Sequence, residues 1–351
     1  MGRDKGVVYN IVDSVKGGSG KTTFAITLSI ILNRYLNEPG INKETSSCLI
    51  DMDIQGSALL YLLYGKAFLD RPEKEKDFKF LNDRVIAVGE DEETAKKFIY
   101  PFCFENSSKN YFDVIFCDPR TERKKKFRSM SNQNYSPEVL YSTFRMGLAN
   151  MLSSMRRQNP YNYSEIIFDM PPNADGYSDA VYDIMLKKDY SVLGEEDVCN
   201  LFLLHTLDMG QIQATLDYFS ELASSENFHK FNKIFFVFND WCGYKKKAGQ
   251  EDKGLFKEAV LHERDQIRNK LGMANSSTLL KKIYFVGLQF NEKYYRMCTQ
   301  TDGIMNGQLV NGMLNPVKYI ANMFENMEND PSGDSVQEKT KRLKEILGMD
   351  K

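Results

Sequence analysis

Short apolar runs alternate with helical patterns along most of this chain. The runs are rich in β-branched and aromatic residues, which is typical of buried strands. The predicted strands cover residues 7–12, 48–53, 111–118, 164–172, 200–207, 233–240 and 281–288. Apolar residues at helical spacing predict helices directly after Gly20, over 137–157 and over about 210–224. This alternation favours βαβ units, and therefore an α/β fold with a mostly parallel, doubly wound sheet flanked by helices.

Two segments interrupt the alternation. Residues 65–109 mix charges of both signs, as in RPEKEKDFKF and GEDEETAKKF, and are interpreted as an insertion with some helix. Our hypothesis for the insertion is partner recognition. Residues 326–351 begin with the composition of a flexible linker and end in the pattern of a short helix. We therefore expect one domain over 1–325, with a charged insertion at about 65–109, followed by the linker and helix.

Composition and charge narrow the class of protein. The 351 residues are 42% hydrophobic and 27% charged, which is enough apolar material for a sizeable core. The 46 basic and 48 acidic residues give a net charge of −2, so any nucleic-acid binding must come from a local patch. No apolar run is long enough to span a membrane, and the first residues lack the features of a signal peptide. These features favour a cytoplasmic protein.

The six cysteines are scattered along the chain. None belongs to a CxxC pair, so the sequence gives no local support for a zinc or iron–sulfur site. Several lie in apolar, strand-like runs, where we expect buried free thiols. The cysteines are Cys48, Cys103, Cys117, Cys199, Cys242 and Cys298.

A glycine-rich loop, KGGSGKTT over residues 16–23, follows the first predicted strand. Its end fits the phosphate-loop pattern GxxxxGK[ST], although Val15 stands where that pattern has its first glycine. Glycines allow neighbouring N–H groups to face one anion, and the helix that begins after Gly20 adds the positive end of its dipole. Lys21 would then reach the β- and γ-phosphates, and the Thr22 hydroxyl would bind Mg²⁺. An ordinary glycine turn is the alternative.

Lys16 opens the same loop, and the general pattern does not explain it. A second ammonium group would be redundant within one chain. If Lys16 points outward, it can complete the site of a second subunit and stabilise charge on the phosphoryl oxygens there. The position of Lys16 therefore favours a site that a second subunit completes.

KGGSGKTT resembles the deviant Walker A motif of the ParA/MinD family of ATPases. CLIDMDIQGSAL resembles the family's second motif, and IIFDMPPNADG, with Pro171 and Pro172, resembles its Walker B strand and switch. FFVFND resembles the strand whose terminal asparagine recognises adenine. Ile54 replaces the family's usual proline, and Gly287-Leu288 stands where Pro-Arg is usual. The resemblance covers roughly residues 5–64, 110–240 and 280–310, and it implies a SIMIBI-type P-loop NTPase fold.

The resemblance also implies ATP and Mg²⁺ as ligands and a role for each matching residue. Lys21, Asp53 and Lys16 would be catalytic, with Lys16 contacting the partner's nucleotide in a homodimer that forms in the ATP state. Asp53 ends the second motif's strand, and a carboxylate near the γ-phosphate can orient the attacking water. Thr22, Asp169 and Asp51 would serve the metal. The nucleotide would contact Gly17, Gly18, Ser19, Gly20, Lys21, Thr22, Thr23 and Asn239.

Family members differ in the surface that the ATP-bound dimer binds. Partition-type members bind DNA non-specifically and are stimulated by an adaptor protein, whereas MinD-type members bind membrane through a C-terminal amphipathic helix. Two basic runs, Arg120–Arg128 (RTERKKKFR) and Lys245–Lys247, are candidates for DNA contact, with solvated loops as the alternative. Residues 340–351 offer only a small apolar face, so we do not expect membrane binding.

The expected function is therefore a slow, partner-stimulated ATPase that binds non-specific DNA for plasmid or chromosome partition. Such a protein would be cytoplasmic and associated with the nucleoid. The alternative is a MinD-like positioning or regulatory ATPase that binds a membrane or protein surface instead of DNA. A nucleotide-binding scaffold with little hydrolysis ranks last, because every residue needed for Mg-ATP hydrolysis is present.

Overall fold

The computed structural model describes the following residues: 6–36, 45–53, 59–64, 80–81, 99–102, 112–117, 136–157, 162–172, 178–187, 192–206, 208–239, 261–269, 279–287 and 324–326. Within them a nine-stranded sheet runs in the order β3-β4-β2-β5-β1-β6-β7-β8-β9. Its inner strands are parallel, whereas β3 and β9 are antiparallel to their neighbours. The strands are β1 Val8–Asp13, β2 Thr45–Asp51, β3 Tyr100–Phe102, β4 Phe112–Ile115, β5 Asn162–Asp169, β6 Val198–Thr206, β7 Phe231–Asn239, β8 Ile283–Gly287 and β9 Phe324–Asn326.

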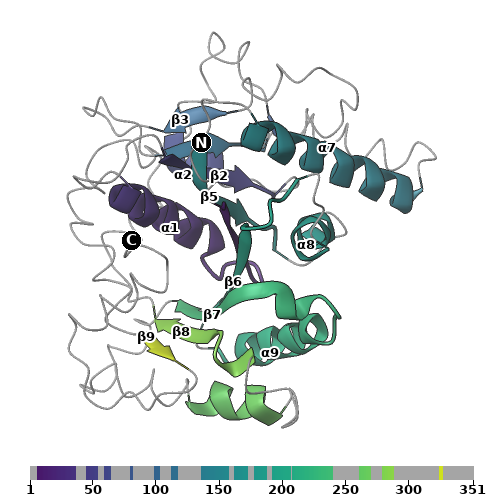
Figure 1. The fold of residues 1–351 in the computed structure, drawn as a ribbon. Helices are drawn as coiled ribbons and strands as arrows, with labels where there is room; N and C mark the ends of the chain where they lie inside the picture. Colours follow the sequence, from purple (N-terminus) through teal and green to yellow (C-terminus); the bar gives the residue numbers. More distant parts are fainter. Residues whose placement is uncertain are drawn as a thin grey trace.

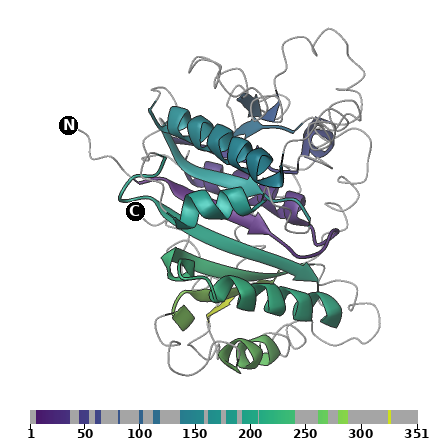
Figure 2. The ribbon, with the colours of Figure 1, turned by 90° about the vertical axis from the view of Figure 1, so that its right-hand side faces the viewer.

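Helices cover both faces of this sheet (Figures 1 and 2). One face carries α1, and the other carries α7, α8 and α9. Helices on both faces of a parallel sheet confirm the predicted doubly wound α/β fold. The helices are α1 Lys21–Leu36, α2 Leu59–Tyr64, α7 Pro137–Arg157, α8 Ser178–Leu186 and α9 Met209–Ala223, with a 3₁₀ turn η2 at Phe228–Lys230 and a further helix over 261–269.

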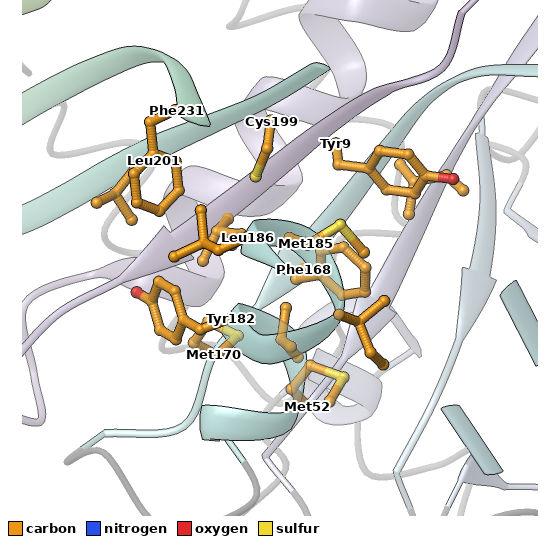
Figure 3. Close-up of a cluster of buried hydrophobic side chains, with 14 of the residues drawn as sticks. Tyr9, Met52, Phe168, Met170, Tyr182, Met185, Leu186, Cys199, Leu201 and Phe231 are labelled. Carbon is orange, nitrogen blue, oxygen red and sulfur yellow. The ribbon is translucent and has the colours of Figure 1, made fainter. Parts of the chain in front are cut away.

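The main core lies between the sheet and the helices α7, α8 and α9. Tyr9, Phe168 and Leu201 point from the strands into this layer, and Met185 and Leu186 of α8 pack against them (Figure 3). Central strands of a parallel sheet are buried on both faces, which explains why they appear in the sequence as continuous apolar runs. The described cysteines, Cys48, Cys117 and Cys199, are buried free thiols, as predicted.

Part of the predicted insertion packs on the sheet. Within the range 65–109, the strand β3 pairs antiparallel with β4. Phe80 and Leu81 are also buried, and the Leu81 amide donates a hydrogen bond of 2.7 Å to the Phe116 carbonyl. At the other sheet edge, β9 crosses residue 325, where we predicted the end of the domain.

Candidate nucleotide-binding site

Three strand ends meet at one edge of the sheet. β1 is paired in parallel with β5, which is paired in parallel with β2. The register places Val12 beside Asp169, and Asp169 beside Asp51. Because the strands are parallel, their carboxyl ends and the loop after β1 face the same crevice, where ligands of open α/β sheets bind.

The loop after β1 depends on glycine at two positions. Gly18 and Gly20 have φ angles of 79° and 86°, a left-handed conformation that glycine adopts without steric cost. A Cβ atom at Gly20 would also lie 2.0 Å from the Asn239 side-chain nitrogen. The helix α1 begins directly afterwards, and its first turn is closed by a 2.9 Å bond from the Phe24 amide to the Gly20 carbonyl. The loop therefore presents its backbone and the start of a helix at the same point.

Lys21 is held inside this loop. Its side chain is buried, and Nζ donates a 2.8 Å hydrogen bond to Ser14 Oγ. Burial lowers the pKa of Lys21, while the nearby carboxylates of Asp13, Asp169 and Asp53 raise it. Lys21 thus lies among the acidic strand ends, where an incoming phosphate would compete with them for its charge.

Lys16, by contrast, is exposed at the front of the loop. A Cβ atom at Gly210 would lie 3.7 Å from Lys16 Nζ, which places the ammonium group beside the start of α9. The side chain is therefore available at the surface, as a contact with a second subunit requires. That contact stays a prediction.

Asp169 and Thr22 fit a hydrated Mg²⁺ ion. Asp169 ends β5, and its side chain is 2% exposed. Thr22 donates a hydrogen bond to this carboxylate, but Oδ1 of Asp169 is buried without a hydrogen-bond partner among the described residues. Buried polar atoms are normally satisfied, so an orphaned carboxylate oxygen beside a threonine hydroxyl suits a metal-bound water.

Asp51 has other contacts. Its Oδ1 accepts a 3.0 Å bond from the Asp53 amide, and Oδ2 accepts a 3.4 Å bond from the Cys117 amide. Both oxygens thus bind backbone N–H groups at the ends of β2 and β4. The arrangement favours Asp51 as the residue that shapes the turn carrying Asp53, while its predicted role at the metal remains untested.

Asn239, the last residue of β7, lies against the loop. Its side-chain Nδ2 donates a 2.7 Å hydrogen bond to the Ser19 carbonyl. The amide therefore helps to fix the loop from the side of β7. Adenine recognition by Asn239 stays a prediction.

Asp13 is a site residue that we did not predict. It ends β1 directly before the loop, is 3% exposed, and accepts hydrogen bonds from Tyr182 and Tyr218. Burial raises the pKa of Asp13, and these hydroxyls, together with Lys21, lower it. One signal was available, because Asp13 ends its strand as Asp51 ends β2. No local pattern marks the tyrosines, since they lie far away along the chain.

The pKa of Asp169 leads to a testable pH dependence. Burial, with smaller contributions from Asp53 and Asp13, raises this pKa to about 7. Between about pH 4 and pH 7 the folded state then holds a proton that the unfolded state has lost, so the free energy of unfolding falls as the pH rises. Asp169→Asn should remove this loss. In the absence of nucleotide and divalent metal, we compare the free energy of unfolding of the variant with that of wild type. We expect this difference to shift in favour of the variant by roughly 2–4 kcal/mol between about pH 4 and pH 8.

Thermal and urea unfolding across this pH range would check the result. Glu226→Gln, which neutralises an exposed acid in place of a buried one, is the matched control. A constant difference between Asp169→Asn and wild type would show that the Asp169 carboxyl does not titrate in this window.

Several sequence predictions fall outside the described residues. They are the basic runs Arg120–Arg128 and Lys245–Lys247, the positions Ile54, Gln55 and Gly56 of the second motif, and the C-terminal segment 340–351. Among the described helices, none combines the length and apolar character that crossing a bilayer requires.

Solved structures of ATPases share this architecture. No protein-family model and no curated protein matches the sequence. An ATP complex of a McdA variant from Cyanothece superposes with a TM-score of 0.54 and 13% identity, over 99% of this chain and 98% of that one. The pNOB8 ParA structure superposes with a TM-score of 0.53 and 14% identity, over 99% and 100%. Together with the loop geometry, these likenesses show that the chain has the P-loop fold of the ParA/MinD-type deviant Walker A ATPases, which its motifs resemble.

Proposed function

We propose that this chain is a Mg-ATP-dependent ATPase that dimerises with ATP and binds non-specific DNA in that state. The observation that carries ATP binding is the loop. Two glycines with positive φ precede a helix start, and the buried ammonium of Lys21 lies among three carboxylates. Such a loop is a ready-made site for a polyphosphate. The McdA variant with this fold was solved as an ATP complex, which supports the same ligand here.

The residues around the loop have distinct tasks in this proposal. Lys21 and the loop N–H groups bind the phosphates, and Asp53 orients the attacking water. Thr22 and Asp169 would hold Mg²⁺, which when bound neutralises charge on the phosphate oxygens. The turn at Pro172 lies against the loop, since a Cβ atom at Gly17 would be 3.8 Å from the Pro172 side chain. A phosphate in the loop would therefore be sensed at the turn that follows β5.

Dimerisation and DNA binding complete the proposal. Exposed Lys16 would enter the partner's site, so that two bound ATP molecules close the dimer. The basic runs Arg120–Arg128 and Lys245–Lys247 would neutralise phosphates of the duplex. Hydrolysis would reopen the dimer, and slow turnover, accelerated by an adaptor protein, would set the lifetime of the DNA-bound state.

Binding to random double-stranded DNA tests this function. We expect fluorescence anisotropy to show binding with ATP and none with ADP or without nucleotide. The Asp53→Ala variant should prolong the ATP state and strengthen the signal. Changing Lys124, Lys125 and Lys126 together to alanine should reduce the slope of log K against log salt by about 3 if all three contact phosphates.

The matched control changes Lys245, Lys246 and Lys247 to alanine. The run that contacts DNA is the one whose change reduces the salt slope. Absence of DNA binding in every nucleotide state, with ATP-dependent dimerisation intact, would contradict the DNA proposal. It would instead favour the MinD-like alternative, in which the dimer binds a membrane or protein surface.

A further inference from the structure

A buried carboxylate connects two helices to the base of the phosphate loop. Oδ2 of Asp13 accepts hydrogen bonds from the Tyr182 hydroxyl of α8 at 2.6 Å and the Tyr218 hydroxyl of α9 at 2.9 Å. Tyr182 is itself 7% exposed and packs in the core beneath the sheet (Figure 3). Hydrogen bonds to an ionised group in a buried setting are among the strongest in proteins.

The same carboxylate continues into the loop through Ser14. Oδ1 of Asp13 accepts a 2.7 Å bond from the Ser14 amide. Ser14 Oγ donates to the Lys16 carbonyl at 2.8 Å, and it accepts bonds from Ser19 Oγ at 2.7 Å and from Lys21 Nζ at 2.8 Å. Asp13 and Ser14, with their hydrogen bonds, therefore connect the two tyrosines to the Lys21 ammonium group and to the backbone carbonyl of Lys16.

The two helices also begin close to site residues, in the sequence for α8 and in space for α9. The first residue of α8, Ser178, follows the Pro171–Pro172 turn closely in the sequence. At the N-terminus of α9, the Asp208 side chain caps the helix by accepting a bond from the Gln211 amide, and Gly210 lies beside Lys16. The helix α9 thus meets the site at its start and at its tyrosine, and α8 meets it at its tyrosine, so a shift of the loop acts on both helices.

We propose that Asp13 is a positioning residue that ties α8 and α9 to the phosphate loop and transmits ATP occupancy to both helices. This inference rests on the proposed ATP binding. When ATP binds, Lys21 exchanges Ser14 Oγ for phosphate oxygens, and the bonds around Ser14 and Asp13 must rearrange. The tyrosine hydroxyls hold Oδ2 of Asp13 in hydrogen bonds with the two helices, so this oxygen is not free to bind Lys21.

Removing the hydroxyls should therefore have two separable effects. The helix whose tyrosine is changed loses its link to the loop. In addition, a buried carboxylate without its donors is left to compete with phosphate for Lys21, which weakens ATP binding. A purely structural hydrogen bond would lower stability and would produce neither effect.

Tyr182→Phe, Tyr218→Phe and the double variant test the proposal. The control is Tyr163→Phe, because Tyr163 donates a 2.6 Å bond to Asp113 in an equivalent tyrosine–aspartate pair that joins β5 to β4 at the amino ends of the strands. ATP affinity and amide hydrogen exchange, with and without ATP, are measured for each protein. The double variant should bind ATP about tenfold more weakly than the control, as expected for the loss of bonds to a charged group.

Hydrogen exchange should show which tyrosine transmits ATP occupancy to which helix. Wild type and Tyr163→Phe should show ATP-dependent protection in both α8 and α9. Tyr182→Phe should lose this response in α8 alone, and Tyr218→Phe in α9 alone. Adding Asp13→Asn to the double variant should restore affinity to within about threefold of wild type, because a neutral amide does not compete for Lys21, while the helix responses stay absent.

Each alternative result has a distinct meaning. If all tyrosine variants match Tyr163→Phe in ATP affinity and in helix protection, Asp13 is structural and the proposal is overturned. The single variants decide the question even if the double variant does not fold. If wild type itself binds no ATP, the proposed function fails first, and this inference fails with it.

Discussion

Lys21→Met should weaken ATP binding by at least about 100-fold, because it removes a charge-assisted contact to the phosphates. Methionine matches the unbranched, apolar stem of lysine and lacks its ammonium group. In the described structure Lys21 Nζ is buried and bound to Ser14 Oγ, so its loss removes a desolvated cation and should leave folding intact. Calorimetric titration with ATP measures the affinity, and a thermal melt confirms the fold.

Lys16→Met is the matched control, since Lys16 is exposed in the same loop. We expect its monomer to bind ATP with an affinity close to that of wild type and to lose ATP-dependent dimerisation in light scattering. Equal loss of ATP affinity in both variants would contradict the proposal that Lys21 binds ATP in its own chain and that Lys16 acts in the partner's site.

Asp53→Ala should slow ATP hydrolysis by at least about 100-fold, which is the usual contribution of a group that positions or deprotonates the nucleophile. Asp53 follows the end of β2, and its charge raises the pKa of Lys21 and of Asp169, so it lies close to both. ATP binding and dimerisation should be retained, because the phosphate contacts come from the loop. Phosphate release and light scattering measure the two properties separately.

Asp51→Asn is the control for this change. Its two oxygens accept backbone N–H groups, so the variant should lose stability with a much smaller loss of hydrolysis. If Asp51→Asn abolishes hydrolysis while Asp53→Ala retains it, the catalytic assignment moves from Asp53 to Asp51.

Sequence patterns predicted the strands and helices whose buried residues form a continuous run or recur at a regular spacing. The parallel strands are buried on both faces and therefore appear as apolar runs, and the long helix over 137–157 has a full apolar stripe. The helix α8 was missed because its nine residues are too few to separate a helical from an extended period. The three-residue edge strands β3 and β9 carry too little pattern for any such assignment.

The candidate site likewise contains residues with a local sequence pattern and contacts between residues that are distant in the sequence. The loop residues and strand-end acids are contiguous in the sequence, so their chemistry is visible without coordinates. The partners of Asp13 are separated from it by 169 and 205 positions, and the tertiary fold alone brings their hydroxyls to its carboxylate. Contacts of this kind have no local signal, because tyrosine on a helix face is equally typical of an ordinary core.

The central place of β1 in the sheet governs when the loop can form during synthesis. Its two neighbours are β5, which ends at Asp169, and β6, which ends at Thr206. A nascent chain that stops before Thr206 lacks at least one of these two neighbours, and closing such long loops makes parallel sheets slow to fold. The nucleotide site therefore matures only after more than half of the chain has been made. Until then, the apolar first strand lacks a neighbour and is exposed to misassembly.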